Sequence, residues 1–187
     1  MAKIRCFLAL PASPAVQSAV ASLIADLQSE ASDAKWQDPQ KLHLTLKFLG
    51  SVETELVQRI SEALLTLARY HSAFDIVYEG LGGFPSLDHP TVVWVGTKTS
   101  EPMQRLHSDV ENAVSQFGFV RDTRLFHPHI TLARIKASGK LHRLTAKIKS
   151  ITFEPVLMRC TEVLVMRSEL HRDSSRYTVV QSIPLLL

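Results

Sequence analysis

The residues KLHLTLKFLG at positions 41–50 and FHPHITLAR at positions 126–134 decide how this 187-residue chain is organised. In both stretches polar and apolar side chains alternate with a period of two, which predicts a β-strand in each. Both also contain the pattern His, apolar, Thr, apolar. A bare His-x-Thr triplet is expected about 0.5 times by chance in such a chain. The doubled four-residue pattern is therefore the informative signal.

The two patterns place an imidazole and a hydroxyl on the same face of each strand. Side chains at positions i and i+2 of a strand project together. His43 therefore lies beside Thr45, and His129 lies beside Thr131. Two separate strands that each present this pair predict a composite site. A third triplet, His-Pro-Thr at 89–91, contains proline and is expected to be a turn.

The remaining sequence predicts an alternation of helices and strands without a linker. A helix precedes each of the two motif strands, which indicates two related lobes within one domain, residues 1–187. The strands are expected at 3–10, 41–49 (ended by Gly50), 73–81, 91–97, 128–133, 151–155, 162–167 and 177–183. The helices are expected from Ser13 to Leu27, at 54–70, from Ser100 to Gly118 and, more weakly, at 137–149, with 29–39 as a loop.

Composition excludes several classes of protein. The chain is 45% hydrophobic and 21% charged, with a net charge of +3, which is typical of a globular protein and not of a basic nucleic-acid coat. It contains no apolar run long enough to cross a membrane, and its early apolar stretch is too short for a signal peptide. Two cysteines, Cys6 and Cys160, cannot form a disulfide framework. We therefore expect a cytoplasmic protein.

The paired motifs point to acid–base chemistry on a phosphodiester. Two histidines across a cleft can serve as acid and base, since an unperturbed imidazole titrates near neutrality. Two threonine hydroxyls can donate hydrogen bonds to phosphate oxygens. No acidic cluster is present to hold Mg²⁺, so the sequence favours hydrolysis without a metal or other cofactor. The competing interpretation is a zinc site at His127 and His129, but no third ligand is evident.

These motifs resemble those of the 2H phosphoesterases and, within them, the RNA 2′,3′-cyclic phosphodiesterases, also called 2′-5′ RNA ligases. The similarity extends to IRCFLALP near the start, GGFPS at 82–86 before TVVWVG, and SELHRDSSRY at 168–177. It thus covers nearly the whole chain. The resemblance implies an α+β, bilobal fold, in which two pseudo-symmetric lobes place antiparallel sheets around a central cleft with helices on the outside.

The resemblance also implies a reaction and the residues for it. A terminal RNA 2′,3′-cyclic phosphate would be hydrolysed to a 2′-phosphate, with His43 as proton donor to the 3′ oxygen and His129 as proton acceptor from water. Thr45 and Thr131 would bind the phosphate. The residues themselves do not determine which histidine is the acid. The reverse reaction with an RNA 5′-hydroxyl would give 2′-5′ ligation.

Three further residues are candidates by similarity. Arg134 follows the second motif and would bind phosphate, since a planar cation suits that anion; the alternative is a surface arginine. Phe48 would stack on a nucleobase only if the strand bends near Gly50, and core packing is the alternative. Tyr177 would line the cleft or serve as an ordinary strand aromatic. His71, His107, His142 and His171 are expected to be solvated.

The expected partners are RNA ends or nucleotides that carry a 2′,3′-cyclic phosphate, with tRNA fragments among the candidates, and a monomer is expected. The positive charge is expected near Arg134, Arg121, Arg124 and the basic residues of 167–176. Two alternatives remain: a 2H phosphoesterase for another cyclic or 2′-5′-linked nucleotide, and an RNA-end-binding module with little turnover.

Overall fold

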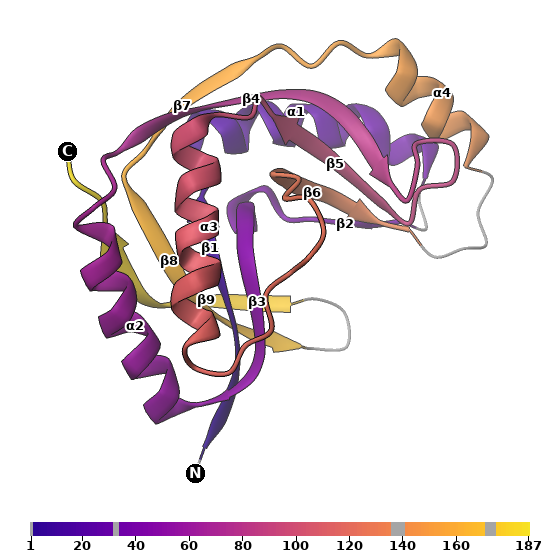
Figure 1. Ribbon diagram of the computed structural model, residues 1–187. Coiled ribbons are helices and arrows are strands. Elements are labelled where there is room, and N and C mark those ends of the chain that lie inside the picture. Colours follow the sequence, from indigo (N-terminus) through magenta and orange to yellow (C-terminus); the bar gives the residue numbers. More distant parts are fainter. Residues whose placement is uncertain (1, 32–33, 136–140, 171–174) are drawn as a thin grey trace.

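The protein has an α+β fold built on one strongly curved antiparallel sheet, as the computed structural model in Figure 1 shows. The structure describes residues 2–31, 34–135, 141–170 and 175–187. Within these residues the strands are β1 Lys3–Pro11, β2 Lys35–Trp36, β3 His43–Glu53, β4 Phe74–Phe84, β5 Val92–Thr97, β6 His129–Arg134, β7 Val156–Cys160, β8 Glu162–Leu170 and β9 Ser175–Pro184. The prediction of an α+β class is confirmed.

The sheet consists of two halves that meet at the two motif strands. One half has the order β9-β8-β1-β3 and the other has the order β6-β5-β4-β7, while β2 pairs with β6. The halves join through the pair Leu44 and Ile130, the middle residues of the two motifs. Continuing this antiparallel register places His43 across from Thr131 and Thr45 across from His129. The two motifs predicted from sequence are therefore brought together by their own apolar residues.

In the part of the chain that the structure describes, α-helices cover the outside of the curved sheet. They are α1 Pro14–Leu27, α2 Thr54–Ala68, α3 Glu101–Ser115 and α4 His142–Ser150. In Figure 1, α2 and α3 lie side by side; α2 contacts β3 and β9, and α3 contacts β3. α1 contacts β7 and α4, over the other half. The main core fills the space between helices and sheet, and a smaller cluster of Phe7, Ala9, Leu164 and Met166 packs on the inner face with Tyr177.

Local signals read from the sequence set the helix boundaries. Ser13 caps α1, since its side chain accepts a hydrogen bond of 3.3 Å from the backbone N–H of Val16, and Pro14 follows at the first helical position. Gly118 lies just beyond α3 with a φ of 86°, the left-handed region that favours glycine. In the described residues, no helix has both the length and the apolar character to cross a membrane.

Several predicted strand boundaries are wrong; β4 runs to Phe84 where 81 was expected, and β8 runs to Leu170 where 167 was expected. Gly50 does not end its strand, because β3 stays paired with β1 as far as Glu53. Gly50 has a φ of 73° and lies at a register irregularity between the two strands, so it marks a bulge. Residues 151–155 are not a strand either. Ile151 and Phe153 pack against the core, and the paired strand starts only after Pro155, which has no N–H to donate.

Two further predictions need correction or lie outside the described residues. Residues 29–39 are not purely a loop, because β2 within them pairs with the end of β6. The expected weak helix at 137–149 corresponds to α4, which begins at His142. The part of that prediction at 137–140 lies outside the described residues.

Candidate active site

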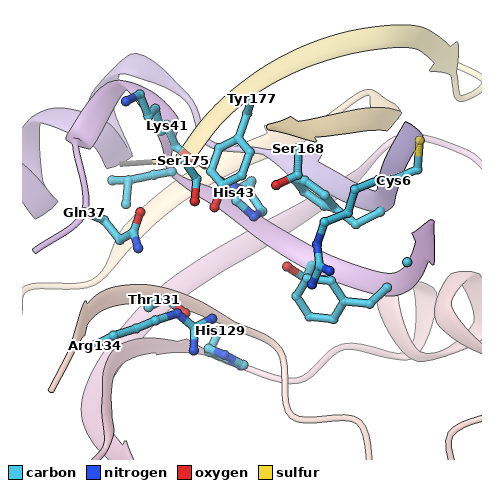
Figure 2. Close-up of a pocket in the computed structure, with 16 residues that line it drawn as sticks. Cys6, Gln37, Lys41, His43, His129, Thr131, Arg134, Ser168, Ser175 and Tyr177 are labelled. Atoms are coloured by element: carbon cyan, nitrogen blue, oxygen red, sulfur yellow. Dashed lines mark hydrogen bonds between the residues drawn. The ribbon is translucent and has the colours of Figure 1, made fainter. Parts of the chain in front are cut away.

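A cavity of about 440 Å³ lies on the inner face of the sheet where the two halves meet. In Figure 2, His43 and Tyr177 lie on one side of it, and His129, Thr131 and Arg134 lie on the other. It is lined by Arg5, Cys6, Phe7, Gln37, Lys41, Leu42, His43, Thr45, Phe48, Gly50, His129, Thr131, Arg134, Ser168, Ser175 and Tyr177. All seven residues singled out from the sequence therefore line one cavity.

The two histidines are held in the same way. The Nδ1 atom of His43 lies 2.8 Å from the carbonyl oxygen of Lys41, and Nδ1 of His129 lies 2.7 Å from that of His127. A carbonyl oxygen can only accept a hydrogen bond, so each Nδ1 carries a proton and donates a hydrogen bond to the backbone carbonyl two residues upstream. Each Nε2 is then left for chemistry with a substrate. This matched arrangement fixes the tautomer of both rings.

Aromatic side chains pack around each imidazole. The ring centroid of His43 lies 4.7 Å from that of Phe7 and 5.1 Å from that of Tyr177. The ring of His129 lies 5.1 Å from that of Phe84, edge to face. These contacts restrict ring rotation and remove water from the histidines.

Trp94 packs close to His129, the histidine of the second motif. Its ring lies 4.5 Å from that of His127 and 6.1 Å from that of His129. A Cβ atom added to Gly82 would overlap the Trp94 ring. Glycine at position 82 therefore allows the indole to lie across β4 and reach the site.

Burial lowers the pKa of both imidazoles from the ordinary value of 6.5. For His43, the hydrogen bond to Lys41 partly offsets this, and positive charge on His129 lowers the pKa further. For His129, the hydrogen bond to His127 is the offset, and the charges of His127 and Arg134 lower the pKa. Because protonation of His129 lowers the pKa of His43, the pair disfavours the state in which both rings are charged.

Phe48 reaches the site because β3 is irregular. The pairing of β1 with β3 shifts register between Leu8 and Ala9 and again between Cys6 and Phe7. Strict alternation would have placed Phe48 opposite His43, but its side chain is 63% exposed and lines the cavity. The bend that stacking would require is therefore present, slightly before Gly50.

Several lining residues were missed by sequence reasoning. Arg5 and Phe7 project from β1 toward the cleft because β1 lies next to β3. Their spacing by two residues was a usable signal, but their strand partner was not evident from sequence. Lys41 and Gln37 precede the first motif on the turn that leads into β3. Lys41 also forms a 3.6 Å ion pair with Asp38, within the same turn.

Most of the described basic residues that were expected near the site do not line the cavity. Arg134 lines the cavity, but Arg121 and Arg176 do not. Arg167 forms an exposed 2.7 Å ion pair with Glu169. Arg124 lies beside a second cavity and is paired with Asp122 at 2.6 Å. The basic residue at 172 lies outside the described residues. The cavity is lined by the cations Arg5, Lys41 and Arg134, of which Arg134 was expected.

The prediction that the other histidines are solvated is wrong for two of them. His71 is only 6% exposed, and its Nε2 lies 3.1 Å from Asp109 on α3, which ties the end of α2 to α3. His107 is half-buried and stacks on Phe126 with ring centroids 3.8 Å apart. His142 is exposed, as expected, and His171 lies outside the described residues.

The zinc interpretation gains no ligand set from the structure. Among the described residues, no three His, Cys, Asp or Glu side chains gather closely enough to hold a metal ion. His127, the proposed second ligand, instead packs its ring against Trp94 and Phe84. The absence of a cofactor stays a prediction.

A model of the 2′-5′ RNA ligase superfamily matches residues 13–172. The chain belongs to that superfamily. It is 31% identical over 94% of its length to an RNA 2′,3′-cyclic phosphodiesterase of Methanothermobacter thermautotrophicus, 96% of which is covered. It is 28% identical over 94% of its length to a protein of the same name from Thermotoga maritima, 92% of which is covered. A solved structure from Thermus thermophilus superposes with a TM-score of 0.81 at 26% identity, covering 97% of this chain and 98% of that one. The 2H phosphoesterase family and fold inferred from the doubled motif are confirmed.

Proposed function

We propose that this superfamily member hydrolyses the 2′,3′-cyclic phosphate at an RNA end to a 2′-phosphate. The observation that carries the proposal is the matched pair of histidines in one cavity with two threonines, each histidine with its Nδ1 hydrogen-bonded to a backbone carbonyl. The relatives that share about 30% of its residues over nearly the full length bear the name of that activity.

By similarity to the family, His129 is the base and His43 is the acid. The base must start neutral; burial first, and then the charges of His127 and Arg134, lower the pKa of His129 and so favour its neutral form. Water attacks phosphorus and gives its proton to Nε2 of His129. The bond from phosphorus to the 3′ oxygen breaks, and that oxygen takes a proton from His43. The products are a 3′-hydroxyl and a 2′-phosphate.

Other residues of the cavity would hold the phosphate and the nucleobase of the substrate. Thr45 and Thr131 would donate hydrogen bonds to the non-bridging oxygens of the phosphate, and Arg134 would balance the negative charge that develops on them. Phe48 and Tyr177 would contact the nucleobase, since both aromatic rings border the same space.

The partner we propose is an RNA end, tRNA fragments included, and not a long duplex. Cations cluster at one cavity, which suits a single terminal phosphate better than a continuous backbone. Both histidines come from one chain, so we propose that a monomer is sufficient. Cys6 and Cys160 are buried free thiols, which is compatible with the proposed cytoplasmic setting.

The test is incubation with an RNA that ends in a 2′,3′-cyclic phosphate, in the presence of EDTA. Formation of a 2′-phosphate that is lost in both His43→Ala and His129→Ala supports the proposal. His142→Ala, an exposed histidine on α4, is the matched control and should keep full activity. Unchanged substrate rejects the proposal, and tight binding without product favours an RNA-end-binding module. Activity that appears only with added zinc rejects the metal-free mechanism.

A further inference from the structure

A second cavity of about 660 Å³ adjoins the first on the side of His129. Thr45, Phe48 and His129 line both cavities. His43 lines the first cavity and does not line the second. The second cavity therefore meets the reacting centre at one histidine.

The loop that leads from α3 to β6 is drawn in Figure 1. Its residues 122 and 124–127 form one wall of the second cavity. A buried ion pair fixes that loop in place. Lys47 Nζ lies 2.8 Å from Glu111 Oε2 and also donates to the carbonyl oxygen of Val120 at 2.7 Å. The same Glu111 oxygen accepts from the backbone N–H of Asp122 at 3.1 Å. The wall is thus anchored to both β3 and α3.

The lining of the second cavity is suited to a nucleobase. Phe126 and His107 stack face to face, with rings tilted by 7°, and Phe84 contributes a further aromatic surface. Leu125 is 97% exposed and Phe48 is 63% exposed, so two large, exposed apolar side chains border this space. Aromatic and apolar surfaces of this kind bind unstacked bases.

We propose that this cavity binds the nucleoside that carries the 5′ oxygen in 2′-5′ ligation and in its reversal. The inference rests on the proposed function, with His129 as the proton acceptor. The nucleophile approaches phosphorus from the side of the base, opposite the leaving 3′ oxygen. An incoming 5′-hydroxyl must therefore lie beside His129, and the second cavity is the space there that can hold the rest of its nucleoside.

The reaction balances in both directions. In ligation, the 5′ oxygen bonds to phosphorus and its proton passes to His129. The bond to the 3′ oxygen breaks, and that oxygen takes a proton from His43. In cleavage of a 2′-5′ linkage, the 3′ oxygen attacks and gives its proton to His43, while the departing 5′ oxygen takes one from His129.

Leu125→Asp tests the inference, because Leu125 lines the second cavity and does not line the first. Its side chain is exposed and so contributes little to folding. Two reactions are compared by kcat/KM: cleavage of a 2′-5′-linked dinucleotide and hydrolysis of a 2′,3′-cyclic mononucleotide. The ratio of cleavage to hydrolysis should fall roughly tenfold in Leu125→Asp, since an apolar contact is lost and negative charge faces the nucleotide. Thr123→Asp puts the same charge on an exposed position of the same loop that lines neither cavity, and should keep the wild-type ratio.

The outcomes separate the two proposals. A wild-type ratio in Leu125→Asp overturns the second-cavity inference and leaves the proposed hydrolysis standing. So does a wild-type enzyme that hydrolyses the cyclic mononucleotide but does not cleave the dinucleotide. An equal fall in Thr123→Asp shows a general charge effect and also overturns it. A wild-type enzyme without hydrolysis removes the proposed function and this inference together.

Discussion

Replacement of Glu111 by glutamine should destabilise the protein substantially. The Lys47 and Glu111 side chains are 10% and 4% exposed, and they form a 2.8 Å ion pair between β3 and α3. Glutamine keeps the shape of the side chain but removes its charge. Among the described residues, the buried Lys47 ammonium would then face two neutral acceptors, the Val120 carbonyl and the glutamine amide oxygen, and no carboxylate.

The expected cost follows from this burial. Removing one partner of a buried ion pair typically costs 3–5 kcal/mol, because it leaves the other charge uncompensated. Lys47 keeps some contact with water, so the cost should lie near the lower limit, about 3 kcal/mol. For a chain of this length, that loss corresponds to a fall in Tm of roughly 6–12 °C.

Urea denaturation of four variants measures this cost. They are wild type, Glu111→Gln, Lys47→Met and the double variant, which form a double-mutant cycle. The double variant should be more stable than the sum of the single losses implies, because no charge is left unpaired. Arg159→Met, which breaks the half-exposed 3.1 Å pair with Asp75, is the control and should cost about 0.5 kcal/mol or less. A Glu111→Gln loss below about 1 kcal/mol, or strict additivity in the cycle, would refute the reasoning.

Three further predictions follow from the site. Arg134→Gln should raise the pKa of His129 and so move the ascending limb of the pH dependence of kcat/KM to higher pH; an unmoved limb contradicts the electrostatic argument. Gly82→Ala should cost about 1–3 kcal/mol in urea denaturation, because the added Cβ overlaps the Trp94 ring, and wild-type stability would contradict this packing. Burial raises the pKa of Cys160 to about 11, so native protein should resist a disulfide reagent at pH 8 and react when unfolded; rapid native labelling contradicts the burial.

The catalytic candidates could be predicted from sequence because the signal is local. The alternation of His43 with Thr45, and of His129 with Thr131, sets the facing direction of each pair within four residues. The doubling of the motif then implied that the pairs meet. The two motif strands are joined by the pair Leu44 and Ile130, which also lies within the motifs.

The rest of the site depends on long-range pairing that one sequence does not reveal. Phe7 contacts His43 because β1 lies beside β3, and Tyr177 does so through β9 and β8. The exposure of Phe48 required a register shift, between Leu8 and Ala9 of the paired strand, that no propensity indicates. His107 and Glu111 lie on α3, far from either motif in sequence, and reach the second cavity only through packing.

The pH dependence of kcat/KM for cyclic phosphate hydrolysis, measured in EDTA, tests the central claim most directly. The account predicts a bell, since a neutral His129 gives the ascending limb and a protonated His43 gives the descending one. Because burial lowers both pKa values from 6.5, the descending limb of the free enzyme should lie at or below that value. In the residual activity of the variants, His129→Ala should lose the ascending limb and His43→Ala the descending limb. A profile with one limb in the wild type, or one unchanged by both substitutions, would contradict paired acid–base catalysis.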